Sequence, residues 1–199
     1  MTLSRFVSTN HPQQTAKRGP SDEVDDRGTD PAFIASLEDR FGKFTLDVAA
    51  APHNAKAPAY YTRQEDGLTQ PWTGRVWCNP PYSDIRSWVE KAWSEWSNYK
   101  PIYEEGADGT LDVVGQRKRP ELIVMLLPAN RTEQKWWQDL VEPRRDRPSF
   151  GNPRRIPVAP FRVEFLPGRM RFDRPDWTPG PKGDRPPFGC CLLIWGGAK

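Results

Sequence analysis

The stretch Asn79-Pro80-Pro81-Tyr82 combines residue types that could carry chemistry. Asn79 offers an amide oxygen, the Pro80 carbonyl offers a second hydrogen-bond acceptor, and Tyr82 offers a ring on which a flat group can stack. Pro80 and Pro81 donate no backbone hydrogen bond and fix φ, so they hold these groups stiffly. Two acceptors that draw on the hydrogens of a conjugated exocyclic amine favour a tetrahedral nitrogen, whose lone pair can attack a methyl group. The motif therefore suits a planar substrate with such an amine.

The elements on either side of this motif must position it. Before it, Arg75 to Cys78 is an apolar stretch of strand length. After it, Ser83 or Asp84 can cap a helix whose apolar residues recur at three and four residue spacing. These residues are Ile85, Trp88, Val89, Ala92, Trp93 and Trp96. Asn79 is thus expected at the carboxyl end of a strand, where open α/β sheets tend to bind ligands.

A second strand that ends in an acidic residue lies earlier in the chain. The spacing of apolar residues predicts a helix that begins with Asp30 as cap and Pro31 at its first position and closes at Gly42. A strand is expected from Phe44 to Val48, followed by small residues and the loop "PHNAKAP". Asp47, near the end of this strand, has the place of an acidic residue in many nucleotide-type pockets, although the spacing alone favours a plain strand-to-loop connection.

The rest of the chain completes an α/β pattern. A short extended piece is expected around Tyr60-Tyr61, and residues 121–129, "ELIVMLLPA", form a continuous apolar run typical of a strand buried on both faces. The helix "TEQKWWQDLV" should follow, capped by Thr132. Strand candidates "FRVEFLP", "GRMRFDR" and "FGCCLLIWG" come last. Strands paired with helices and then a strand cluster predict an α/β sheet. Residues 97–120 are expected to be an inserted loop or hairpin.

Composition limits the classes that remain. The 199 residues have a net charge of +3, 36% hydrophobic residues, a mean hydropathy of -0.79 and nine tryptophans, which is typical of one small core with long polar loops. Residues 1–28 are polar without periodicity and are expected to form a disordered arm. We expect a soluble, intracellular chain, because no apolar run could span a membrane and the start lacks a signal peptide. The three cysteines fit buried thiols, and with two histidines a metal site is not expected.

The net charge of the chain is small, but positive charge is concentrated in one segment. Residues 143–157, "PRRDRPSFGNPRRIP", hold five arginines against one aspartate within a basic, proline-rich loop expected over 143–160. Such a loop can contact DNA phosphates, and a solvated surface connection explains it equally well. The candidate DNA contacts are Arg131, Arg144, Arg145, Arg154 and Arg155.

The motif in its setting resembles a known enzyme family. Asn79 to Tyr82 after an apolar strand matches the amino-methyltransferase motif, and residues 29–83 followed by "LLPANRTEQKWW" and "GRMRF" resemble the small phage-type DNA N6-adenine methyltransferases of the Dam group. The resemblance spans roughly residues 29–195. It implies a small variant of the Rossmann-like class I methyltransferase fold over 29–199, with a mostly parallel sheet and helices on both faces. It also implies S-adenosylmethionine as cofactor and a cytoplasmic enzyme of a phage or prophage.

The resemblance carries over residue by residue. It implies that Asn79, Pro80, Pro81 and Tyr82 hold the target adenine, which must leave the stack of double-stranded DNA. The residues that it places near the cofactor are Thr29, Pro31, Asp47, Ala49, Asp66 and Asn79. The chain departs from many methyltransferases in having "LDVAAA" where they have a glycine-rich loop. S-adenosylmethionine carries no phosphate, so a phosphate-binding loop is not required.

The sequence leaves several alternatives open. The same motif occurs in protein glutamine methyltransferases, and RNA is a further substrate for such chemistry. A non-catalytic DNA-binding module could also keep this fold. We expect DNA methylation, in a phage or prophage setting related to host restriction and modification. The recognition sequence and the oligomeric state are not readable from the residues.

Overall fold

The computed structural model describes residues 28–97, 101–105, 111–116, 119–145, 161–170, 172–173 and 188–197. Residues 1–27 of the expected arm, most of the basic loop, and both Arg154 and Arg155 lie outside these residues, whereas Gly28, the last residue of that arm, lies in a strand.

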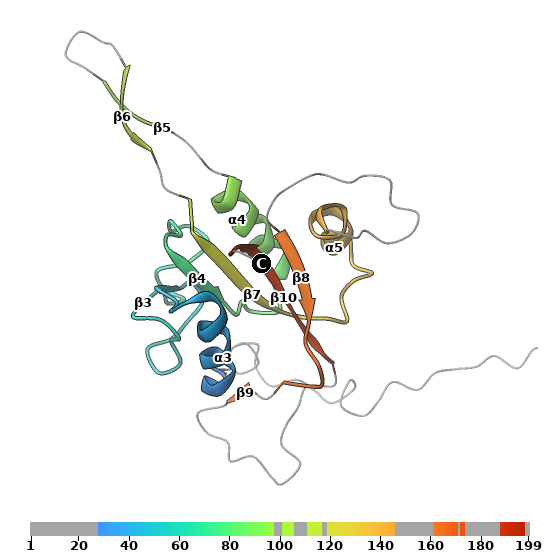
Figure 1. Cartoon of the computed structure of the whole chain (residues 1–199). Coiled ribbons are helices and arrows are strands. Elements are labelled where there is room, and N and C mark those ends of the chain that lie inside the picture. The colour runs from blue at the N-terminus through green and yellow to red at the C-terminus, as the bar shows by residue number, and fades with distance from the viewer. Residues whose placement is uncertain are drawn as a thin grey trace, which may run out of the picture.

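The central feature is a six-stranded sheet with the order β3, β2, β4, β7, β10, β8 (Figure 1). Its strands are β2 (Leu46–Asp47), β3 (Ala59–Tyr60), β4 (Arg75–Cys78), β7 (Leu122–Pro128), β8 (Phe161–Phe165) and β10 (Cys190–Gly196). The pairs from β3 to β7 are parallel, and β10 is antiparallel to both β7 and β8. Five strands therefore run in one direction, and only β10 is reversed among them.

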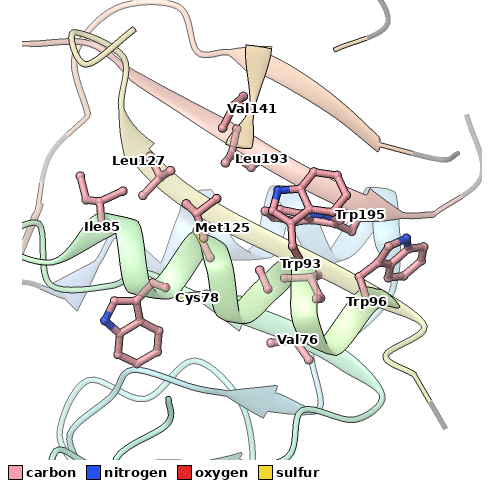
Figure 2. Packing of buried hydrophobic residues seen from close by; sticks show 14 of the residues in the cluster. Val76, Cys78, Ile85, Trp93, Trp96, Met125, Leu127, Val141, Leu193 and Trp195 are labelled. Carbon is pink, nitrogen blue, oxygen red and sulfur yellow. The ribbon is translucent and has the colours of Figure 1, made fainter. Parts of the chain in front are cut away.

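Helices cover both faces of the sheet, because its buried strands carry apolar residues on both faces. On one face, α3 (Pro31–Phe41) packs Ile34 and Leu37 into a core with Trp77. On the other face, α4 (Ile85–Ser97) and α5 (Lys135–Leu140) bury tryptophans against alternate strand residues. Figure 2 shows Trp93 and Trp96 of α4 in this second core, with Met125 of β7 and Trp195 of β10. The expected mostly parallel α/β sheet of Rossmann-like type is confirmed.

The helices α3 and α4 begin where the sequence predicts, and α3 also ends there. Asp30 caps α3 by accepting a hydrogen bond from the backbone N–H of Ala32 (2.7 Å), and Gly42 ends the helix with φ of 80°. At the start of α4, Asp84 accepts bonds from the hydroxyl of Ser87 (2.9 Å) and from its backbone N–H (3.5 Å). Both connections into these helices are thus fixed by short-range side-chain hydrogen bonds.

Two expectations about element bounds need correction. α5 begins at Lys135, and Thr132 does not cap it, because residues 131–134 form a turn in which the Gln134 N–H bonds to the Arg131 carbonyl (3.1 Å). β2 covers only Leu46–Asp47, although the backbone N–H groups of Thr45 and Val48 also bond to β4 carbonyls. The segment that bonds to β4 is thus close to the strand expected from Phe44 to Val48, although β2 itself is shorter than that strand.

Among the described residues, a hairpin, a pair of two-residue strands and a single-turn helix lie outside the main sheet. The hairpin of β5 (Pro101–Glu105) and β6 (Leu111–Gln116) falls in the expected insert and points away from the body (Figure 1). It leaves the end of α4 and returns at the start of β7, so it emerges at the edge opposite to the carboxyl ends of the parallel strands. β1 (Gly28–Thr29) pairs antiparallel with β9 (Phe172–Asp173). A single-turn helix, η1 (Glu142–Arg144), follows α5.

No helix among the described residues is long and apolar enough to cross a membrane.

Candidate active site

The carboxyl ends of β2 and β4 border a hollow at one edge of the sheet. Because β2 and β4 are parallel neighbours, with Leu46 opposite Val76, the residues that follow each strand meet at this edge. The hollow is lined by Gly28, Thr29, Asp47, Ala49, Asn54, Lys56, Trp77 and Asn79. Four of the predicted cofactor-side and catalytic residues, Thr29, Asp47, Ala49 and Asn79, are thus brought together.

Asp47 is the buried acid of this hollow. Its side chain accepts hydrogen bonds from the backbone N–H groups of Lys56 (2.9 Å) and Ala49 (3.3 Å), and only 2% of the residue is exposed. Burial raises the pKa of Asp47 to about 6, against the opposing effects of these two bonds and of the Lys56 charge. With this pKa the carboxylate is mostly ionised at neutral pH and can accept further donors.

The motif forms the turn between β4 and α4. Asn79 lines the hollow, Pro80 is buried, and the Pro81 carbonyl accepts a hydrogen bond from the Asp84 N–H (3.2 Å). Among the described residues, none donates a hydrogen bond to the Pro80 carbonyl. The prolines therefore hold the Asn79 side chain and the Pro80 carbonyl on a stiff turn at the edge of the sheet.

Tyr82 stands in an aromatic group with two residues from the far end of the chain. Its ring meets Phe172 edge-on, with centroids 6.5 Å apart and planes at 86°, and lies 6.2 Å from Phe188 at 60°. The topology explains this contact, because β8 ends and β10 begins at the same edge where β4 ends. The three rings form an aromatic wall next to the motif.

Thr29 joins the aromatic wall to the hollow. In the β1 and β9 pair, Thr29 lies directly opposite Phe172, and the threonine is 1% exposed. Its hydroxyl oxygen is buried and has no hydrogen-bond partner among the described residues. A buried hydroxyl without a partner costs about 1–3 kcal/mol, so this position favours a ligand that supplies the missing hydrogen bond.

Two predicted cofactor residues do not reach the hollow. Pro31 is exposed at the first position of α3, where it serves the helix start. Asp66 is exposed in a turn with φ of 54°, and its side chain accepts a bond from the Leu68 N–H (3.1 Å). Neither residue is among those that line the hollow, so both remain predictions without support from this geometry.

The predicted DNA-contacting arginines separate into two kinds. Arg131 lies three residues beyond the end of β7, at the same edge as Asn79, and its Nε has no partner among the described residues. Arg144 donates to the carbonyls of Asp139 (2.9 Å) and Leu140 (3.1 Å) and lies over the ring of Trp93. Arg145 pairs with Glu142 at 2.8 Å. Arg144 and Arg145 thus hold the end of α5.

Several residues of the site were missed by sequence reasoning. Asn54, Lys56 and Trp77 line the hollow, and Phe172 and Phe188 contact Tyr82. The loop "PHNAKAP" carried a usable signal, because polar residues after an acidic strand end are placed at the ligand edge of a sheet. The two phenylalanines gave no such signal, since only the strand order brings them to Tyr82.

Comparison with known proteins agrees with the resemblance. Residues 18–104 match the model of the family described as DNA N-6-adenine-methyltransferase (Dam). Two phage proteins of the name DNA N-6-adenine-methyltransferase are similar to parts of the chain. That of Escherichia phage T1 is 38% identical over 92 residues, which cover 44% of this chain and 34% of the relative. That of Haemophilus phage HP1 is 43% identical over 54 residues, or 27% of this chain and 31% of the relative.

The predicted resemblance to the phage Dam group is therefore confirmed. The matched stretch includes, by position, Thr29, Asp47, Lys56 and the motif, and it ends before β7. The chain spans about a third of the length of these two relatives. No solved structure matches the chain. Within the described residues, no group of three histidine, cysteine or acidic side chains could hold a metal ion.

Proposed function

We propose that this protein transfers a methyl group from S-adenosylmethionine to the exocyclic N6 amine of adenine in double-stranded DNA. The observation that carries the proposal is the placement of Asn79 in one hollow with Asp47 and Thr29, next to the aromatic wall of Tyr82, Phe172 and Phe188. A methyl donor and a flat amine-bearing substrate need two adjoining sites, and the hollow and the wall adjoin at Asn79.

The role of Asn79 and Pro80 is to accept the two hydrogens of the target amine. An aromatic amine is a weak nucleophile because its lone pair is conjugated with the ring. Acceptors that hold its hydrogens out of the ring plane favour a lone pair directed at the methyl carbon. Pro81 fixes the turn, so the acceptors need no rearrangement when the substrate arrives.

The residues of the hollow fit S-adenosylmethionine. The Thr29 hydroxyl lacks a partner among the described residues, and the Asp47 carboxylate can accept from an ammonium or a ribose hydroxyl. When bound, S-adenosylmethionine would supply a methyl group carried on a cationic sulfur. The sulfur–methyl bond would break as the bond from N6 to the methyl carbon forms, and the proton lost by N6 would pass to water. The carboxylate of Asp47 also favours a cationic ligand over a neutral one.

Tyr82 is proposed to hold the flipped adenine. Extruding a base from the duplex costs a few kcal/mol, and stacking on an aromatic side chain returns about 1–3 kcal/mol per base. Phe172 and Phe188 both contact the Tyr82 ring, so the ring is held in place before the base arrives. Little rotational freedom of the ring is then lost on binding.

Arg131 is the proposed phosphate contact closest to the reacting base, because it lies at the same edge as Asn79. Arg154 and Arg155 remain proposed contacts outside the described residues. The β5–β6 hairpin emerges at the opposite edge, which argues against a role for it in reading the bases next to the flipped adenine. The biological setting that we propose is the cytoplasm of a bacterial host, where a phage or prophage enzyme marks DNA against restriction.

The test is transfer of labelled methyl groups from S-adenosylmethionine to unmethylated duplex DNA, with RNA and protein substrates in parallel. Asn79→Ala should lower the rate at least about 100-fold, because one of two acceptors for the amine is lost. Asn130→Ala is the matched control, since Asn130 is exposed and lies outside the hollow. It should keep the full rate.

The outcomes separate the candidate functions. Label in N6-methyladenine of DNA that depends on Asn79 supports the proposal. Label only in RNA or in protein glutamine would assign the same chemistry to another substrate. Full activity of a folded Asn79→Ala protein would remove the proposed mechanism, and no label with any substrate would leave a non-catalytic module on this fold.

A further inference from the structure

We propose that Lys56 is the anion-binding residue of the hollow and that it holds the carboxylate of the methionine portion of S-adenosylmethionine. This inference rests on the proposed function and deepens it, since it names which part of the cofactor lies against which wall. It concerns a residue that the motif does not include.

The loop after β2 fixes the backbone of Lys56 at the hollow. Residues 51–55 form a tight turn, in which the N–H groups of Asn54 and Ala55 both bond to the Ala51 carbonyl at 3.1 Å. The Asn54 side chain closes the turn by accepting from the Ala51 N–H (2.8 Å). The chain then returns to β2, where the Lys56 N–H bonds to Asp47 (2.9 Å). Lys56 therefore sits on an ordered segment.

The charge of Lys56 is not used by the fold in the way that other lysines are used. Lys43, Lys91 and Lys135 each form an ion pair of 2.6 Å with an acidic side chain. Among the described residues, Lys56 makes no ion pair within 4.0 Å, although its charge acts on Asp47 through space. Its ammonium thus keeps donors for a ligand in the hollow.

The pair of charges in the hollow matches a zwitterion. Asp47 has a carboxylate and Lys56 has an ammonium, and both residues line the hollow. An amino acid group carries the opposite pair, an ammonium for Asp47 and a carboxylate for Lys56. Charge-assisted hydrogen bonds of this kind are among the stronger ones in proteins. A nucleoside without the amino acid group would bring no carboxylate to Lys56.

The experiment measures ligand binding by titration calorimetry, so it does not depend on methyl transfer. The ligands are S-adenosylhomocysteine and 5′-methylthioadenosine, which lacks the amino acid group. Lys56→Met should weaken binding of S-adenosylhomocysteine about 10- to 100-fold, the range for one hydrogen bond to a charged group, and change binding of methylthioadenosine less than about 2-fold. Lys135→Met is the matched control, because Lys135 is 79% exposed and lies on α5 away from the hollow. It should change neither affinity.

Equal weakening of both ligands by Lys56→Met, or no weakening of either, would overturn the assignment while leaving the proposed function in place. A wild-type protein that binds no S-adenosylhomocysteine and transfers no methyl group would overturn both. If Lys56→Met does not fold, the wild-type protein still decides the matter: it should bind decarboxylated S-adenosylhomocysteine at least about 10-fold more weakly than S-adenosylhomocysteine. Equal affinity for the two ligands would overturn the inference.

Discussion

The edge of the sheet that bears the hollow and the end of α5 are both rich in polar side chains, and they use them in opposite ways. At the hollow, the Thr29 hydroxyl has no hydrogen-bond partner and Lys56 makes no ion pair among the described residues. At the end of α5, every cation has a protein partner, since Arg144 bonds to two carbonyls and Arg145 pairs with Glu142.

This difference separates residues that receive a ligand from residues that hold the fold. A buried polar atom without a partner costs about 1–3 kcal/mol, so a fold tolerates it mainly where a ligand completes it. A buried charge that has a partner in the protein contributes to the fold instead. Removing one partner destabilises the protein, because the other charge is left buried and uncompensated. Substitutions at the hollow should therefore impair binding without loss of stability, and substitutions at the end of α5 should impair stability.

Asp47→Asn gives the largest expected effect. The folded-state pKa of about 6 exceeds the ordinary 3.8, so folding favours the neutral acid. The stability that the neutral Asp47 side chain contributes is fully present below about pH 4 and is lost as the pH rises through 6. At pH 8 the variant should therefore be more stable than the wild-type protein by up to about 3 kcal/mol, since one pKa unit corresponds to about 1.4 kcal/mol. Urea unfolding between pH 4 and pH 8 measures this difference.

The same Asp47→Asn protein should bind S-adenosylhomocysteine about 10- to 100-fold more weakly at pH 8, because a charge-assisted hydrogen bond is lost. In the wild-type protein this binding should weaken as the pH falls through 6, where Asp47 becomes neutral. An Asp47→Asn protein that is destabilised at pH 8 and binds S-adenosylhomocysteine normally would show that Asp47 holds the fold rather than the ligand.

Arg145→Ala should have the next largest effect, and on stability alone. Glu142, whose side chain is 3% exposed, would lose its ion pair with Arg145, although it would keep the bond from the Trp137 indole (3.2 Å). We expect a loss of about 2–3 kcal/mol in the free energy of unfolding, below the range for fully buried pairs because Arg145 is partly exposed. Urea titration measures this loss.

The double variant Arg145→Ala with Glu142→Gln should recover at least about 1 kcal/mol, since glutamine carries no charge and still accepts the indole bond. If Arg145→Ala leaves stability unchanged and instead lowers the salt dependence of DNA binding, then Arg145 belongs with the nucleic-acid contacts, as its position in the basic segment first indicated.

Arg144→Ala should lower stability by a smaller amount, about 1–2 kcal/mol. It removes two hydrogen bonds to the last carbonyls of α5 and the contact of the guanidinium with the Trp93 ring, but it leaves no buried charge unpaired. Thermal unfolding, followed by tryptophan fluorescence, reports on both the stability and the Trp93 environment. Arg86→Ala on α4 serves as control, because the exposed Arg86–Glu90 pair should contribute less than about 0.5 kcal/mol.

The sequence identified the residues of the hollow better than those of the basic segment, for a physical reason. Asp47 and Asn79 end neighbouring parallel strands, and strand ends of one sheet edge must meet, so a local pattern fixed their common position. Arg144 and Arg145 belong to a cluster of arginines in the sequence, and such a cluster does not indicate which groups each arginine contacts. Their partners are the end of α5, Trp93 and Glu142, and these depend on how α5 packs.

The contacts of Phe172 and Thr29 could not be predicted either. Each residue lies in a two-residue strand, too short for a period-2 pattern, and the pair forms between segments that are more than 140 residues apart. The order of the main sheet could not be predicted either, because β10, the last strand in the sequence, lies between β7 and β8.

Arg131→Gln should have the smallest effect on stability and still distinguish the two regions. Arg131 lies at the site edge and has an Nε without a partner among the described residues, so its replacement should change the free energy of unfolding by less than about 0.5 kcal/mol. If Arg131 contacts a phosphate, DNA affinity should fall at every sequence tested, and the slope of log affinity against log salt should become shallower by about 1. Fluorescence anisotropy with labelled duplexes at several salt concentrations measures both quantities. An unchanged slope together with a clear loss of stability would place Arg131 with the structural arginines at the end of α5, and phosphate binding would then rest on Arg154 and Arg155.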